Sequence, residues 1–297
     1  MSGTDRLVAG IELGGTKGIA LIARGTEILE MARVRTTVPR ETLAVLGDAI
    51  AGWRARHGEP AALGIASFGP VGLDRSRDDY GYITLTPKPG WSNADVVGYF
   101  ARRFGLPIVF DTDVNGAALA EYRWGAARGC DVAIYITVGT GVGGGLVVGG
   151  DPVHGLIHPE IGHFRVRRPA RSSFAGVCPF HGDCVEGLIS GPALAARTGI
   201  PGDRIPGDHP VWGEVASELG EAMATLMAVV SPQRIMIGGG VFQNRTDLLA
   251  TVRRRTATAL GGYPAGVDEA RLDAIIVPPA LGDRAGPLGA VALAYRA

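Results

Sequence analysis

A short glycine-rich segment occurs twice in the chain, and this duplication constrains the fold more than any other feature. The first copy is Ile11-Glu12-Leu13-Gly14-Gly15-Thr16-Lys17, and the second runs from Thr137 to Gly145. In each copy an apolar run leads into glycines and threonines, and a second apolar run follows. The pattern predicts a strand, a tight turn and a second strand in each half of the chain.

Both turns have a composition that suits a phosphate group. Glycine lets backbone N–H groups approach an anion closely, while threonine hydroxyls and a lysine add further donors. Either turn alone is equally typical of an ordinary hairpin, but the repetition favours a nucleotide-binding enzyme. Rossmann and Walker patterns are disfavoured, because no G-K-[S/T] occurs and residues 143–145 lead into a strand. The expected phosphate-binding residues are Gly14, Gly15, Thr16, Lys17, Thr137, Gly139, Thr140 and Gly141.

Length and charge limit the classes of partner. With 297 residues the chain is long enough for two lobes. The 29 basic and 29 acidic residues balance, so no global field favours nucleic acid or an anionic membrane. No apolar run reaches the roughly 18–20 residues of a membrane span, and the N-terminus lacks the pattern of a signal peptide. We therefore expect a cytoplasmic protein that binds small molecules.

Strand-like runs alternate with helical patterns along the chain, which indicates the α/β class. We expect strands at 7–11, 19–23, 62–66, 108–110, 132–138, 146–148, 234–237 and 274–277. We expect helices at 43–56, 94–104, 115–124, 191–196, 212–230, 247–260 and 287–296.

The long non-periodic region 149–187 contains a C-x-x-H-x-x-C array with a further histidine upstream. Two thiolates and two imidazoles would complete a tetrahedral zinc site with no open position, which is typical of a structural metal. Alternatively, the cysteines are buried apolar residues. His154 and His158 are rival fourth ligands. The candidate metal ligands are His163, Cys178, His181 and Cys184.

Acidic residues follow the predicted strand 108–110, in the sequence Asp111-Thr112-Asp113, and a helix is expected to begin near Asn115. Ligands of open α/β sheets bind at the carboxyl ends of strands. One aspartate could therefore act as a general base toward a hydroxyl that attacks a γ-phosphate, or it could cap the helix. The spacing does not choose between Asp111 and Asp113.

Taken together, these motifs resemble the ROK family of sugar kinases, and most closely its bacterial fructokinase branch. The resemblance covers nearly the whole chain, at residues 10–17, 81–91, 111–121, 137–145, 160–163, 178–187 and 238–241. It implies a two-lobed, actin-like ATPase fold of duplicated ribonuclease H type, with ATP and sugar between the lobes and Mg²⁺ carried with the nucleotide. The lobes would be 1–116, completed by a C-terminal helix at 284–297, and 117–283 with the zinc loop. We also expect a homodimer.

The resemblance implies a role for each matching residue. Asp113 matches the catalytic base, and His163 could present one ring nitrogen to zinc and the other to the sugar. The residues implied in sugar binding are Thr112, Asn115, Glu160, His163 and Glu186. The residues implied on the adenosine side are Gly238, Gly239, Gly240 and Val241. The chain departs from the family pattern in several places: Glu12 replaces an aspartate, Thr112 replaces an asparagine, the C-x-x-H-x-x-C array replaces a cysteine-rich one, and residues 75–79 do not match the fructokinase segment.

The expected reaction is phosphorylation of D-fructose by ATP. Alternatives are a kinase for glucose or mannose, a sugar-responsive regulator, and an actin-like ATPase that binds a protein. We disfavour the regulator because a first strand near Leu7 leaves no room for a helix-turn-helix domain.

Overall fold

A computed structural model describes residues 6–168, 172–242, 245–263 and 265–297. They divide into two compact units. Unit 1 comprises Met1–Trp124, Asp151–His158 and Asp283–Ala297, and unit 2 comprises Gly125–Gly150 and Pro159–Gly282. Each unit has its own sheet and helices, so the α/β class is confirmed.

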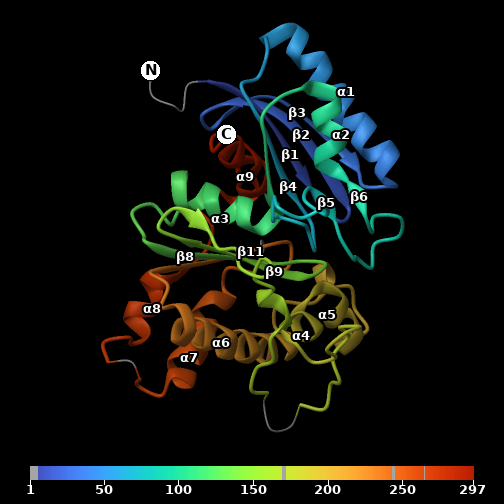
Figure 1. Cartoon of the computed structure of the whole chain (residues 1–297). Coiled ribbons are helices and arrows are strands. Elements are labelled where there is room, and N and C mark those ends of the chain that lie inside the picture. Colours follow the sequence, from blue (N-terminus) through green and yellow to red (C-terminus); the bar gives the residue numbers. More distant parts are fainter. Residues whose placement is uncertain (1–5, 169–171, 243–244, 264) are drawn as a thin grey trace. The chain divides into compact units, whose positions relative to one another are not determined.

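The sheet of unit 1 has the strand order β3-β2-β1-β4-β7 (Figure 1). The first three strands are antiparallel, whereas β4 and β7 run parallel to β1. Every residue of β4 is buried, which explains its uninterrupted apolar run. The strand bounds are β1 Leu7–Leu13, β2 Lys17–Arg24, β3 Glu27–Arg35, β4 Leu63–Ser67 and β7 Ile108–Thr112.

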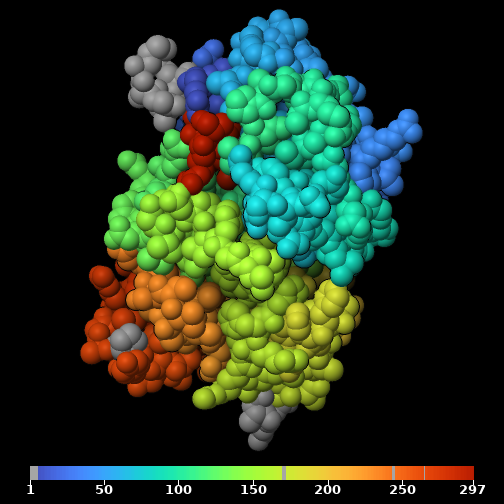
Figure 2. Space-filling model, in the orientation of Figure 1, coloured from blue at the N-terminus to red at the C-terminus, as the bar shows by residue number. Residues whose placement is uncertain are grey.

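Helices cover this sheet, with α1 and α2 on one side and α3 and α9 on the other (Figure 1). Helix α9 is buried at nine of its positions and packs on α3, β1 and β4. A Cβ on Gly64 of β4 would lie 1.9 Å from the carbonyl oxygen of Ala290, so glycine is required for this approach. The space-filling view shows the red C-terminal segment flanked by atoms of the first part of the chain (Figure 2). The bounds are α1 Pro39–His57, α2 Val96–Phe104, α3 Asp113–Trp124 and α9 Ala285–Ala294.

The sheet of unit 2 repeats the same plan. Strands β8 and β9 form an antiparallel hairpin, β11 pairs with β8 in parallel, and β12 pairs with β11 in parallel. The predicted duplication is therefore visible in the strand topology. The bounds are β8 Val132–Val138, β9 Val142–Val148, β11 Arg234–Gly238 and β12 Ile276–Val277.

The helices of unit 2 include the long α6, which is buried along most of one face and packs on α7. Their bounds are α4 Val185–Ile189, α5 Gly191–Thr198, α6 Val211–Val230, α7 Leu248–Leu260 and α8 Glu269–Ile275. The short elements of the chain are β5 Tyr82–Ile83, β6 Ala94–Asp95, β10 Asp151–Pro152, which pairs with β9, and the 3-10 turns η1 Ile161–His163, η2 Gly202–Arg204 and η3 Gly282–Arg284. No helix in the described part of the chain is long and apolar enough to span a bilayer.

Several elements differ from expectation, among them one strand of each unit. The strand predicted at 274–277 is wrong over its first half, because α8 extends to Ile275. The Asp268 carboxylate accepts a hydrogen bond from the Arg271 N–H at 2.8 Å and so caps this helix. Strand β3 was not predicted. It lies at the edge of its sheet and none of its residues is buried, so it lacks an apolar run.

Candidate active site and metal centre

The first glycine turn joins β1 to β2 in unit 1. The Gly14 N–H donates to the Lys17 carbonyl at 3.0 Å, and the Thr36 hydroxyl donates to the Gly14 carbonyl at 2.8 Å. Gly15, Thr16 and Lys17 are exposed. Hydrogen bonds from its own backbone and from Thr36 thus fix the turn, while Gly15, Thr16 and Lys17 remain accessible.

Glu12 lies just before this turn, near the end of β1. Its Oε2 atom is buried and has no hydrogen-bond partner among the described residues. Burial raises the pKa of Glu12, and the positive charges of Lys17 and Arg33 partly oppose that effect. A buried carboxylate oxygen without a partner fits a cation such as Mg²⁺, which prefers oxygen ligands.

The turn between β7 and α3 carries the predicted acidic residues. The hydroxyl of Thr112 caps α3 by accepting from the Asn115 N–H at 3.1 Å. The Asp113 Oδ1 atom accepts a hydrogen bond from the Val114 N–H at 2.9 Å, and Asp113 is half-buried. Asp111 is only 3% exposed, and it accepts hydrogen bonds from the backbone and from neighbouring side chains. Of the two aspartates, Asp113 is therefore the more accessible.

Thr112 and Asn115 are buried beside these carboxylates, at 3% and 1% exposure. The Asn115 Nδ2 atom donates to Asp111 Oδ1 at 2.7 Å. Both side chains therefore form hydrogen bonds within the turn itself.

The second glycine turn, Thr137–Gly141, joins β8 to β9 in unit 2. The Gly139 N–H donates to the Gly141 carbonyl at 2.8 Å, and the Gly191 N–H at the start of α5 donates to the Gly139 carbonyl at 2.7 Å. The predicted adenosine-side segment lies against this turn. The Val241 N–H donates to the Val138 carbonyl at 3.0 Å.

Gly239 shows why the adenosine-side segment must contain glycine. Its φ is +91°, and a Cβ there would lie 2.6 Å from the Thr137 hydroxyl. The segments 137–141 and 238–241 thus form one continuous surface in unit 2, where backbone amides are close together.

Three predicted sugar-binding residues converge in unit 2. The His163 Nε2 atom lies 3.9 Å from Glu160 Oε2 and 3.9 Å from Glu186 Oε1. Burial, and then the charge of Glu186, raise the pKa of Glu160 to about 6. Carboxylates that converge on one point can each accept hydrogen bonds from two neighbouring hydroxyl groups, as a sugar requires.

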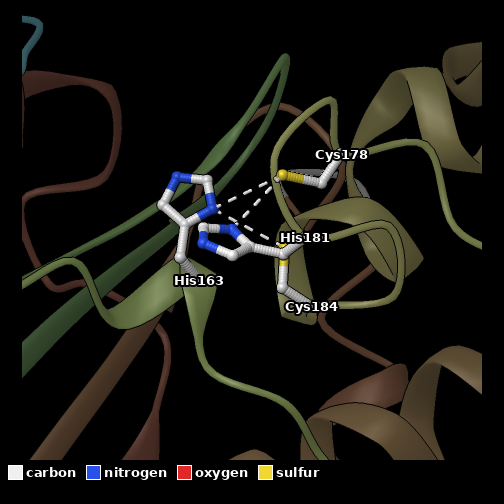
Figure 3. Close-up of side chains that lie close together, drawn as sticks. All are labelled: His163, Cys178, His181 and Cys184. Carbon is white, nitrogen blue, oxygen red and sulfur yellow. Dashed lines mark hydrogen bonds between the residues drawn. The ribbon is translucent and has the colours of Figure 1, made fainter.

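The predicted metal ligands also come together in unit 2 (Figure 3). Their ligand atoms all lie within 4.8 Å of one another. The His163 Nδ1 atom is 3.7 Å from Cys178 Sγ and 3.6 Å from Cys184 Sγ, and His181 Nδ1 is 3.6 Å from Cys178 Sγ. Around tetrahedral zinc, ordinary Zn–S and Zn–N lengths place such atoms about 3.5 Å apart. His163 thus presents Nδ1 to the thiols and Nε2 to the carboxylates.

The thiols themselves fit a metal. Burial raises the pKa of Cys184 to about 11, so the neutral thiol is favoured there without a cation. A divalent ion reverses this preference because it stabilises the thiolate that binds it. The rival ligands are engaged elsewhere: His154 bonds to Asp111, and His158 accepts from the Val71 N–H at 3.2 Å, both within unit 1.

Sequence reasoning missed the contact between His154 and Asp111 and the support that Gly191 gives to the second turn. The sequence pattern indicates His154 only as an alternative metal ligand. Its partner lies 43 residues earlier in the chain, and no local pattern signals such a pairing.

Comparisons with known proteins agree with this geometry. The model of the ROK family matches residues 8–297. The chain is 46% identical to a fructokinase of Zymomonas mobilis, over 100% of this chain and 99% of that protein. It is 38% identical to a fructokinase of Pediococcus pentosaceus, over 98% of each. A crystal structure of a ROK family glucokinase from Streptomyces griseus in complex with glucose and AMPPNP is 28% identical, with a TM-score of 0.77 over 98% of this chain and 100% of that one. The chain belongs to the ROK family.

Proposed function

We propose that this protein is an ATP-dependent fructokinase, which converts D-fructose and ATP to fructose 6-phosphate and ADP. The observation that carries the assignment is 46% identity to a fructokinase over the full length of both chains. The clustering of Glu160, His163 and Glu186 supports a polyhydroxyl substrate, and the two glycine turns support a nucleotide.

Asp113 is the general base of this proposal. Its carboxylate takes the proton of the fructose 6-hydroxyl as the hydroxyl oxygen bonds to the γ-phosphorus, and the bond from that phosphorus to the β-phosphate oxygen breaks to release ADP. The start of α3 favours the ionised carboxylate. The greater accessibility of Asp113 supports the choice over the buried Asp111.

Glu160, Glu186 and His163 Nε2 bind hydroxyl groups of fructose in this scheme. Thr112 and Asn115 contribute through the turn that carries the base, because both are buried and bonded within it. The sugar is then oriented by charged acceptors, which form stronger hydrogen bonds than neutral ones.

The glycine turns at 14–17 and 137–141 bind the phosphates of ATP, and Gly238–Val241 binds its adenosine side. Glu12 would hold the Mg²⁺ that accompanies the nucleotide, since its buried Oε2 atom has no partner among the residues that the structure describes. When bound, Mg²⁺ offsets the negative charge of the triphosphate.

Zinc is proposed as a structural ion at His163, Cys178, His181 and Cys184. Four protein ligands leave no position for a reacting water, so the ion would fix the loop and orient the His163 ring. We also propose a homodimer and a cytoplasmic location.

A coupled ADP-release assay with fructose, glucose and mannose tests the assignment. We expect the highest kcat/KM with fructose and little ATP hydrolysis without sugar. Glucose is the second candidate, because a glucokinase of Streptomyces coelicolor is 29% identical over 97% of both chains. A higher kcat/KM for glucose would favour it, and ATP hydrolysis that no sugar stimulates would contradict the kinase.

A further inference from the structure

A buried carboxylate holds the turn between β7 and α3 together. Asp111 Oδ1 accepts from the Thr112 N–H at 2.7 Å and from Asn115 Nδ2 at 2.7 Å, while Oδ2 lies 3.0 Å from His154 Nε2. The Asp111 side chain is 4% exposed. Such a carboxylate is stable only when hydrogen bonds replace its lost hydration.

The partners of Asp111 bracket Asp113. Thr112 precedes that residue and Asn115 lies in the first turn of α3, so Asp111 accepts from the backbone N–H on one side of Asp113 and from the side-chain amide of Asn115 on the other. A group that reorients Asp111 would therefore displace the turn that carries the carboxylate of Asp113.

His154 reaches Asp111 from a separate segment of unit 1. Four residues further on, His158 is 5% exposed and accepts from the Val71 N–H at 3.2 Å. Two histidines thus anchor one short segment. His154 contacts Asp111 near the end of β7, and His158 contacts Val71 in the turn after β4. The chain then continues directly into Pro159 and Glu160.

The environment of His154 is accessible and charged. Its side chain is 41% exposed, and it lines a pocket of about 430 Å³. The titratable and charged groups that line the same pocket are Arg75, Tyr80, Asp111, Asp151 and Arg296. Asp151 is paired with Arg296, which leaves Asp111 as the carboxylate bonded to the imidazole. A histidine that only fills space in a core would be buried, whereas the His154 side chain is accessible to solvent.

We propose that His154 is a positioning residue for the phosphoryl transfer, and that its hydrogen bond to Asp111 fixes the turn that presents Asp113 to the sugar hydroxyl. The inference rests on the proposed function. It assigns His154 no contact with sugar or nucleotide. Misplacement of a base by a fraction of an ångström lowers the rate of the chemical step more than it changes ground-state binding.

The test compares His154→Ala and His154→Gln with a matched control, His57→Ala. His57 Nε2 lies 3.1 Å from Glu30 Oε1, so it also pairs with a carboxylate in unit 1, at a half-buried position. We expect kcat of His154→Ala to fall about tenfold to a hundredfold, with KM for ATP within about twofold. His154→Gln should recover most of kcat because its amide can donate to Asp111, and His57→Ala should keep the wild-type kcat. A kcat of His154→Ala within twofold of wild type, or no recovery in His154→Gln, would overturn the proposal.

A second measurement does not depend on turnover. The pKa of His154 is followed by NMR of the histidine side chains in the wild type and in Asp111→Asn. The bond to Asp111 raises the pKa of His154, so the pKa should fall in the variant. An unchanged pKa of His154 in this variant would show that His154 and Asp111 do not interact. If the wild type releases no ADP with any sugar, the proposed function fails, whereas this titration still reports on the pair.

Discussion

The Glu186 Oε2 atom lies 2.9 Å from the amide nitrogen of Val142, which follows the second glycine turn. The other oxygen of the same carboxylate faces His163 Nε2. One side chain therefore contacts both the start of β9 and the predicted sugar site. Changes at the glycine turn should consequently alter sugar binding, and changes at the sugar site should alter the glycine turn.

Gly141→Ala tests this connection. A Cβ at this position would lie 2.6 Å from Glu186 Oε2, so the carboxylate must move away from the Val142 N–H. We expect KM for fructose to rise about tenfold, which corresponds to roughly 1.4 kcal/mol of lost binding. Gly213→Ala in α6 is the control, because an added Cβ there meets no atom within 4 Å. Equal fructose KM values in the two variants would show that Glu186 does not transmit the change.

Asp113→Asn should lower kcat by about 10²–10⁴, the usual contribution of a general base, because an amide cannot accept the hydroxyl proton. Fructose affinity measured by calorimetry should stay close to that of wild type. Asp48→Asn serves as the control, since Asp48 is an exposed partner of Arg103. A kcat of Asp113→Asn near the wild-type value would exclude this residue as the base.

Removal of zinc should loosen the region 159–187 of unit 2. Metal analysis of purified protein is expected to give one zinc per chain, and Cys184→Ala should lower both the zinc content and the melting temperature by a clear margin. KM for fructose should rise as well, because His163 Nδ1 loses the ion that orients the ring. Cys130→Ala removes a buried cysteine outside the cluster and should keep the metal. Zinc-free wild-type protein with an unchanged melting temperature would contradict the site.

The stability of the protein should depend on pH through His154. Its folded pKa is raised above 6.5, first by the hydrogen bond to Asp111. The stabilisation is therefore complete below pH 6.5 and is lost as the pH rises through the folded value. His154→Gln should lose more unfolding free energy at pH 6 than at pH 9, by less than about 1 kcal/mol, because the His154 side chain is 41% exposed and solvent screens its charge. Chemical denaturation at the two pH values measures the difference, and an equal loss at both would rule out the charged pair.

The sequence could predict the parts of the molecule that local patterns encode. The buried strand β4 and the helix α6 follow from their apolar residues, and the metal cluster follows from the spacing of Cys178, His181 and Cys184. The edge strand β3 was not predicted, because it has no continuous apolar run: only Leu29, Ala32 and Val34 pack against the core, and none of its residues is fully buried.

The candidate site was predictable where it is formed from short segments and not where it depends on distant contacts. The spacing alone left Asp111 and Asp113 equivalent, and only the family resemblance matched Asp113 to the base; the structure separates the two residues by burial and by the bonds of Asp111 to Asn115 and His154. Similarly, only the fold brings Gly191 to the second turn. These pairings join residues that lie 43 and 52 positions apart, beyond the reach of any periodic pattern.

The close packing of α9 on β4 has a consequence for synthesis. Helix α3 ends at Trp124 and α9 begins at Ala285, so the ribosome must add 160 residues between them. At 5–20 residues per second, this takes on the order of 8–30 s. Throughout that interval the face of β4 around Gly64 lacks α9, so the nascent chain presents apolar sheet that α9 covers in the finished protein. A chaperone that binds such surfaces would meet its substrate in this window, before the last helix emerges.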